Sequence, residues 1–269
     1  MRNKLKAICI THIGFRNKNE DNYLFNGSYT NSQTTQNVKI IETDLSSKKF
    51  QFNFFAVADG MGGHNAGEVA SRVCVEALAL IEKKSQTLSS ISEVVRLVQS
   101  SIVSINEKIC ALGRNNKDLN GMGTTLVLFI TFGDKYAVLN IGDSRAYYFD
   151  GHSLTQITKD HTEGQRMLDL GLLSRKELAN FPAKKNLSRY IGYDKEGFIL
   201  QADVYYPEIT EGVVLLCSDG ITDSMSDERI SGILSSHENI EVAGKILIEE
   251  AVAKPDADNA TAILISIRR

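Results

Sequence analysis

Residues 54–68 read FFAVADGMGGHNAGE, an apolar run that ends abruptly at Asp59-Gly60. Such an uninterrupted run indicates a strand that is buried on both faces. Aspartate–glycine pairs are common in hairpin turns, but here a glycine-rich stretch and a helical pattern over Ala66–Lys84 follow instead of a second strand. The sequence therefore predicts a central strand with an aspartate, Asp59, directly after its last residue.

Acidic residues stand beside apolar strands at further points of the chain. They are Glu20-Asp21 before residues 23–25, Asp143 after residues 138–142, Asp219 after residues 213–218, Asp223 one turn beyond it, and Asp258 before residues 260–267. Each instance alone is more typical of a turn. Their repetition beside buried strands favours a cluster of carboxylates.

Carboxylates that converge at the ends of buried strands repel one another unless cations neutralise them. The donors are oxygens without a set of histidines and cysteines, so we expect hard ions, Mg²⁺ or Mn²⁺. Residues 256–261 do not fit a helix-loop-helix calcium site, because the sixth position lacks glycine. A pair of such ions activates a water for in-line displacement at phosphorus.

Other classes of site and partner find no support in the sequence. It contains no Walker A motif, no G-x-S-x-G elbow and no H-E-x-x-H motif, and Asn65 stands where a dinucleotide-binding loop needs its third glycine. The net charge is −3 and basic residues are scattered, which argues against nucleic acid. No apolar run is long enough for a signal-peptide core or a membrane span, so we expect a soluble, cytoplasmic protein.

The four cysteines lie in apolar runs without C-x-x-C spacing, and we interpret them as reduced core thiols: Cys9, Cys74, Cys110 and Cys217. No linker divides the 269 residues, so a single domain over residues 1–269 is predicted. Apolar residues at helical spacing over Ile91–Ile109 predict a long helix that needs a broad surface to pack on. Pairs of helices between runs of strands indicate the α+β class. The expected strands are residues 6–13, 50–58, 125–130, 136–141, 145–149, 153–157, 199–205, 212–217 and 260–267, and the later helices are 227–235, which Ser226 caps, and 242–253.

As a set, these motifs resemble the protein phosphatase 2C family of metal-dependent phosphatases, in its bacterial form. The matching elements are Arg16-x-x-x-Glu20-Asp21-Asn22, residues 57–64 with 66–68, Gly123-Thr124-Thr125, Gly142-Asp143-Ser144-Arg145, Asp160-His161, Ser218-Asp219-Gly220 with Asp223, and Asp258-Asn259. The resemblance implies two antiparallel β-sheets packed face to face and flanked by pairs of antiparallel helices, a four-layer αββα sandwich.

The resemblance also implies roles for individual residues. Asp59 would bridge two metal ions, Gly60 would offer its carbonyl, and Asp219 and Asp258 would complete the ligands. Glu20 and Asp21 would support the site through waters, and Asp143, Asp219 and Asp223 would form a third, weaker site. Arg16 would bind the substrate phosphate, a task that suits a forked, permanently charged group.

By the same resemblance, the chain removes phosphate from phosphoserine and phosphothreonine by direct attack of a metal-bridging hydroxide. It would be a monomer that opposes a bacterial serine/threonine kinase and acts on that kinase and its targets. Two alternatives stay open: a non-catalytic phosphoprotein-binding regulator of the same fold, and a small-molecule phosphatase with the same metals.

The chain departs from the family pattern in three places. Met61 stands where many eukaryotic members carry a histidine, and His64 belongs to the bacterial pattern, so the general acid is unassigned. A flap is expected at about residues 160–195, but Phe181 and Lys185 do not fit its pattern. Residues 26–50 are longer than a minimal hairpin and are interpreted as variable surface.

Overall fold

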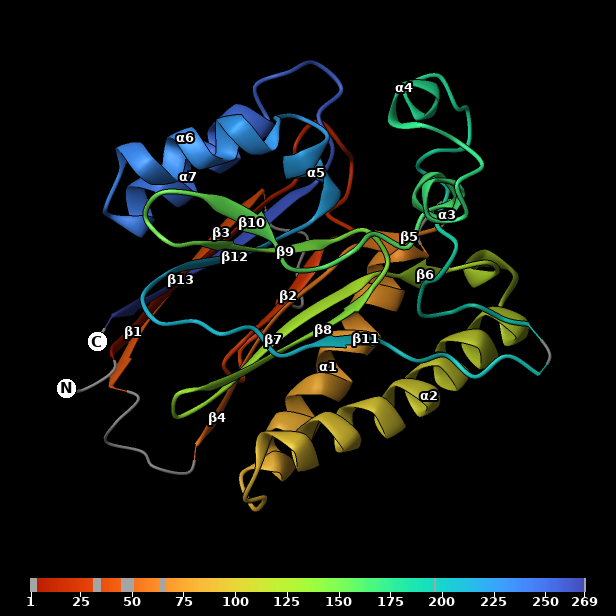
Figure 1. Cartoon of the computed structure of the whole chain (residues 1–269). Coiled ribbons are helices and arrows are strands. Elements are labelled where there is room, and N and C mark those ends of the chain that lie inside the picture. Colours follow the sequence, from red (N-terminus) through yellow and green to blue (C-terminus); the bar gives the residue numbers. More distant parts are fainter. Residues whose placement is uncertain (1–3, 31–34, 45–50, 63–65, 196, 269) are drawn as a thin grey trace.

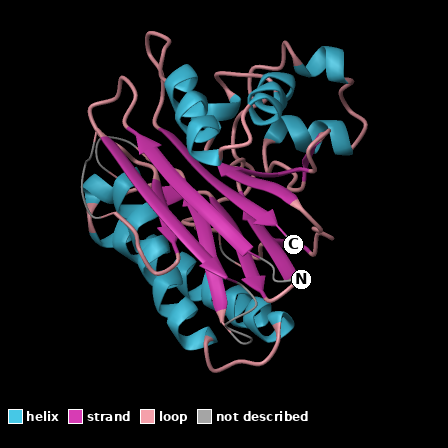
Figure 2. Cartoon of the chain, turned by 90° about the vertical axis from the view of Figure 1, so that its left-hand side faces the viewer, coloured by secondary structure: helices cyan, strands magenta, loops and turns pink. Residues whose placement is uncertain are grey.

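Two antiparallel sheets face each other at the centre of the molecule, and helices cover their outer surfaces (Figure 1). The computed structural model describes residues 4–30, 35–44, 51–62, 66–195 and 197–268. Figure 2, turned by 90°, shows the strands side by side with helices on both sides of them. This arrangement confirms the predicted α+β class with two face-to-face sheets.

The first sheet has six strands, in the order β10-β9-β12-β13-β1-β3. They are β10 Leu154–Gln156, β9 Arg145–Phe149, β12 Gly212–Cys217, β13 Ala260–Arg268, β1 Lys4–His12 and β3 Gln36–Asp44. The second sheet has five, in the order β11-β8-β7-β4-β2. They are β11 Asp203–Tyr205, β8 Lys135–Ile141, β7 Leu126–Phe132, β4 Phe52–Ala58 and β2 Asn22–Phe25. The short strands β5 Gly60–Met61 and β6 Gly123–Thr124 pair with each other.

Each outer face is covered by its own pair of helices. Helices α1, Gly67–Ser85, and α2, Ile91–Asn115, pack on the five-stranded sheet, and the capping box of Ser90 and Glu93 opens α2. Helices α6, Asp227–Ser236, and α7, Ile240–Ala251, pack on the six-stranded sheet. The shorter helices are η1 Lys117–Leu119, α3 Glu163–Asp169, α4 Arg175–Leu178 and α5 Asp219–Thr222.

The apolar run of residues 54–58 lies in β4, between two layers of core. Phe54 and Ala56 pack toward the helices, whereas Phe55 and Val57 pack into the layer between the sheets. Because side chains alternate along a strand, burial on both faces requires consecutive apolar residues. The unbroken apolar pattern thus has a direct structural cause.

Three local predictions differ from the structure. Residues 26–50 were interpreted as variable surface, and the described part from 35 to 42 is largely exposed, but the segment also contains the unforeseen edge strand β3, which pairs with β1 along its whole length. Its outer side chains Val38 and Ile40 are exposed at the sheet edge, so the segment lacks a buried apolar pattern. The expected strand 199–205 shrinks to Asp203–Tyr205, and α5 was not foreseen because it is a single turn.

The four cysteines are buried free thiols, as predicted. None of the helices in the described part of the chain combines the length and hydropathy that a membrane span requires.

The register of the strands brings several strand ends to one edge. β4 and β8 both pair antiparallel with β7, so they run in the same direction and end together at Ala58 and Ile141. β2 begins at the same edge, because Asn22 lies opposite Ala58. In the other sheet, Cys217 at the end of β12 lies opposite Ala262 near the start of β13.

Candidate active site

Acidic residues from both sheets gather at this edge. Asp59 and Asp143 follow β4 and β8, and Asp219 opens α5 directly after β12. These three side chains line a cavity of about 480 Å³. A neighbouring cavity of about 200 Å³ is also lined by Asp143 and Asp219, together with Asp160 and Asp223. The predicted carboxylates therefore meet around connected space at the surface.

The carboxylates influence one another's proton affinity. Burial raises the pKa of Asp59 well above its usual range, and the charges of Asp219, Asp21 and Asp143 add to the effect. Burial likewise raises the pKa of Asp143 to about 7, with Asp219 contributing next. Burial raises the pKa of Asp219 as well, and the charges of Asp223 and Asp258 act in the same direction. A group of buried carboxylates whose pKa values are raised in this way attracts positive charge.

Asp21 is the most deeply enclosed of the predicted supporting acids. Its Oδ2 accepts hydrogen bonds from Ser218 Oγ and Thr261 Oγ1, both at 2.7 Å. Its Oδ1 is buried and has no hydrogen-bond partner among the described residues. Burial raises the pKa of Asp21 to about 7, although the two hydroxyls oppose that shift. One oxygen is thus fixed by the protein, and the other is free to accept a further donor or cation.

The backbone of Asp59 is held by the Gly123-Thr124-Thr125 motif. The Thr125 N–H donates to the Asp59 carbonyl at 2.8 Å, and Thr124 Oγ1 donates to the same oxygen at 3.0 Å. In return, the Asp59 N–H donates to Thr125 Oγ1 at 3.0 Å. Thr125 Oγ1 also lies 2.6 Å from Ser144 Oγ, beside Asp143. The two threonines therefore fix the position of Asp59 and link it to the Asp143 loop, which consists of residues 142–144 after β8.

Asn259 ties the N-terminal acids to the C-terminal ones. Its side-chain amide donates to the carbonyls of Ile13 and Lys18, and its Oδ1 accepts from the Glu20 N–H at 2.8 Å. The Glu20 carbonyl in turn accepts from the Gly60 N–H at 3.2 Å. The predicted residues Glu20, Gly60 and Asp258 are thereby joined by backbone contacts around Asn259.

Arg16 lies at the rim of the site. Its guanidinium is 2.6 Å from Asp258 Oδ2, and both side chains are partly exposed. A charged fork next to the acidic cluster is suitably placed to bind a phosphate that enters from solvent.

The Asp143 loop is held by His161. The imidazole Nδ1 accepts from the Gly142 N–H at 3.0 Å, and the His161 N–H donates to the Gly142 carbonyl at 2.9 Å. The proton of the neutral ring therefore sits on Nε2, which lies 3.2 Å from Asp203. Burial lowers the pKa of His161, which favours this neutral form. His161 is a positioning residue.

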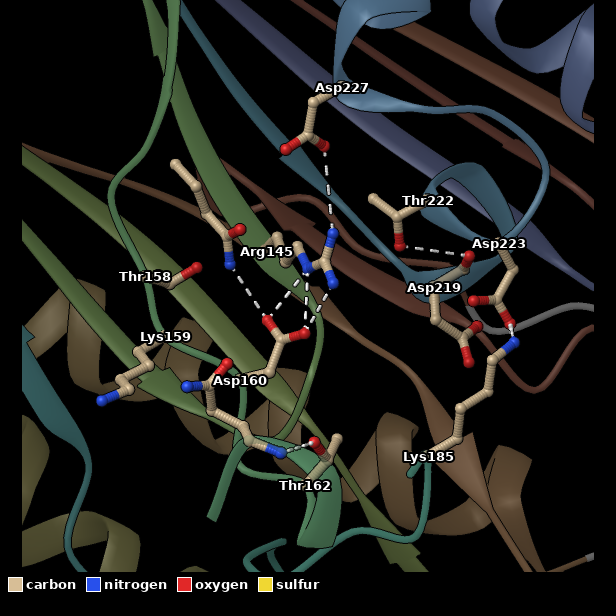
Figure 3. Close-up of polar contacts among 12 residues, drawn as sticks. Arg145, Thr158, Lys159, Asp160, Thr162, Lys185, Asp219, Thr222, Asp223 and Asp227 are labelled. Atoms are coloured by element: carbon tan, nitrogen blue, oxygen red, sulfur yellow. Dashed lines mark hydrogen bonds and ion pairs between the residues drawn. The ribbon is translucent and has the colours of Figure 1, made fainter. Parts of the chain in front are cut away.

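Figure 3 shows polar contacts of the site around Asp160 and Asp223. Arg145 forms a forked contact with Asp160, with Nη2 2.6 Å from Oδ2 and Nε 2.9 Å from Oδ1. Lys185, in the segment after α4, extends to Asp223, where Nζ lies 2.5 Å from Oδ2, next to Asp219. Arg145 and Lys185 were not among the residues predicted from the sequence to form the site.

All nine predicted site residues lie at or beside this edge, but they do not form a closed coordination shell. No three histidine, cysteine, aspartate or glutamate side chains within residues 4–30, 35–44, 51–62, 66–195 and 197–268 are arranged as a complete ligand set. His64, the other residue considered from the sequence, lies outside the described residues. Reading the sequence missed the supporting roles of Thr125, Ser218 and Asn259, although each is adjacent to a predicted acid or motif.

A family model described as protein phosphatase 2C matches residues 44–241. The chain belongs to the protein phosphatase 2C family. A relative in Listeria monocytogenes, the serine/threonine phosphatase stp, is 35% identical over 209 residues, which are 78% of this chain and 82% of that protein. The serine/threonine protein phosphatase PstP of Mycobacterium tuberculosis is 34% identical over 213 residues, 79% of this chain and 40% of that protein.

Solved structures of protein phosphatase 2C members share the whole fold. The phosphatase Stp1 of Staphylococcus aureus superimposes with a TM-score of 0.78 at 28% identity, over 98% of this chain and 95% of that one. The catalytic domain of PstP, solved in complex with two manganese ions, gives a TM-score of 0.75 at 28% identity, over 99% of this chain and 100% of that one. The resemblance seen in the sequence is confirmed.

Proposed function

We propose that this phosphatase is a metal-dependent protein serine/threonine phosphatase that hydrolyses phosphoserine and phosphothreonine. The observation that carries the proposal is the cluster of the Asp59, Asp143 and Asp219 carboxylates around one cavity. Such a cluster is stable at neutral pH only with added positive charge. The names of the relatives and the two manganese ions in the PstP complex support the same reaction and cofactor.

The side chains present fit two hard divalent ions. Asp59, Asp219, Asp258 and the Gly60 carbonyl would hold the ions. The free Oδ1 of buried Asp21 is an oxygen that can accept from a metal-bound water, and Glu20 would act likewise. Waters would complete the coordination, as is usual for Mg²⁺ and common for Mn²⁺. A third, weaker site at Asp143, Asp219 and Asp223 stays a prediction.

When bound, the ions supply an activated water and neutralise charge on the phosphate. The residues of the chain bind and orient the substrate. Arg16, which is paired with Asp258 at the rim of the site, would bind phosphate oxygens with its forked guanidinium. Thr124 and Thr125 keep the Asp59 backbone fixed while the charge in the cavity changes. The group that protonates the leaving oxygen is unassigned.

We further propose a single catalytic domain, a monomer, and action in the cytoplasm on proteins phosphorylated by a bacterial serine/threonine kinase. The absence of a ligand substitution among the nine predicted residues argues for catalysis over a purely phosphoprotein-binding role. The half-exposed Arg16 at an open rim suits a phosphorylated peptide loop better than an enclosed metabolite.

Phosphate release from two substrate classes tests the proposed function. We expect purified protein with Mn²⁺ to release phosphate from phosphothreonine and phosphoserine peptides, and to act on sugar phosphates at least about tenfold more slowly in kcat/KM. A preference for sugar phosphates would contradict the substrate class. No release from either, while Mn²⁺ still binds, would identify the non-catalytic regulator instead.

A further inference from the structure

Lys185 places a positive charge against the outer acids of the site. Its Nζ lies 2.5 Å from Asp223 Oδ2, and the residue lines both the cavity that contains Asp59 and the neighbouring one that contains Asp223 (Figure 3). Asp143 and Asp219 also line both cavities. The ammonium group therefore stands at the border between the proposed metal pair and the outer group of acids.

The backbone on both sides of Lys185 is held in place. The Asn186 carbonyl accepts from the Glu163 N–H at 2.8 Å, and the Lys184 carbonyl accepts from the Gly164 N–H at 3.3 Å. A Cβ on Gly164 would lie 2.6 Å from the Lys184 carbonyl, so the close approach depends on glycine. These contacts fix the segment against the first turn of α3 and present Lys185 to the acids.

The other cations around the outer cavity have different partners. Arg145 is engaged by Asp160 through several hydrogen bonds. Lys184 Nζ donates to the Ala179 carbonyl at 2.7 Å. Among the described residues that line this cavity, Lys185 is the cation that is ion-paired with Asp223. Asp223 thus has a tethered counter-ion from the protein itself.

We propose that the Lys185 ammonium group takes the place of the third cation at Asp143, Asp219 and Asp223. The inference rests on the proposed function, because it presumes the metal pair at Asp59. A divalent ion at Asp223 would have to break the ion pair and then stay close to a like charge, which is unfavourable at such short range. The native protein therefore binds two ions strongly and the third only weakly.

Titration calorimetry with Mn²⁺ at pH 7 tests this proposal in the full chain. We expect Lys185→Asn to bind a third ion at least about tenfold more tightly than the native protein does, which corresponds to about 1.4 kcal/mol. Lys185→Arg keeps the charge and should keep the third ion weak. Lys184→Asn removes a neighbouring charge without touching Asp223, so it serves as the matched control and should resemble the native protein.

The outcomes separate this inference from the proposed function. Two strong sites in every variant, with a third site strengthened only in Lys185→Asn, support the inference. Equal third-site affinity in the native protein and Lys185→Asn overturns it and leaves the proposed function intact. An equal gain in third-site affinity in Lys184→Asn also overturns it, because loss of any nearby positive charge would then explain the tighter binding. Absence of any Mn²⁺ binding contradicts the proposed function as well.

Discussion

At the scale of single residues, Asp21 and Asp59 are each held by groups from a distant part of the chain. Asp21 is held by Ser218 and Thr261, and the backbone of Asp59 is held by Thr124 and Thr125. Such contacts orient acids that would otherwise turn away from one another. Hydroxyl groups suit this role because they donate and accept without adding charge.

Thr125 offers a direct test of this support. We expect Thr125→Val to lower the free energy of unfolding by about 1–3 kcal/mol, because the Asp59 N–H and Ser144 Oγ would each lose a partner. Mn²⁺ affinity should fall by about 10- to 100-fold. Urea unfolding and calorimetry measure the two effects.

Thr125→Ser is the matched control because it retains the hydroxyl, and it should keep most of the metal affinity. If Thr125→Val bound Mn²⁺ as tightly as Thr125→Ser, the Thr125 hydroxyl would stabilise the fold without contributing to metal binding.

At the scale of elements, α1 is tied to the central strand by a buried carboxylate as well as by apolar contacts. Glu82 Oε1 accepts from the Phe54 N–H at 3.1 Å, whereas Oε2 is buried without a hydrogen-bond partner among the described residues. Burial raises the pKa of Glu82 to about 7. The folded state therefore binds this proton more tightly than the unfolded chain does.

This linkage predicts a pH-dependent contribution to stability. Between the unfolded pKa of 4.5 and the folded value of about 7, the Glu82 contribution to the free energy of unfolding falls as pH rises. Glu82→Gln keeps the acceptor for Phe54 and removes the charge. We expect it to stabilise the fold at pH 8 by roughly 1–3 kcal/mol, with little gain at pH 4.5. Urea unfolding at the two pH values checks this, and an equal effect at both would show that burial of the charge is not the cause.

At the scale of the whole molecule, the four layers and the site have one common basis. The central strands are apolar because both of their faces are buried, and their ends are the first places where charge can reach solvent. Antiparallel pairing within the five-stranded sheet then brings Asp59 and Asp143 to the same edge. The fold gathers charges that repel one another, and the proposed cations would relieve that repulsion.

These relations explain which features the sequence could predict. The apolar runs that end in Asp59, Asp143 and Asp219 reflect burial, so the strands and the cluster of acids followed from local pattern, whereas the packing of two sheets face to face was implied by the family resemblance. Strand β3 did not, because it lies at an edge where Val38 and Ile40 are exposed. The ion pair of Lys185 with Asp223 joins residues 38 positions apart through an irregular segment, which no local periodicity indicates.

The central claim is that the acids around Asp59 hold the ions on which phosphate release depends. Phosphate release from a phosphothreonine peptide by Asp59→Asn, in saturating Mn²⁺ and beside the native protein, tests it most directly. We expect a loss of at least about a hundredfold in kcat/KM, since a proposed metal ligand should matter more than a supporting contact. The variant should remain folded by circular dichroism. A folded Asp59→Asn protein with near-native activity would contradict the account.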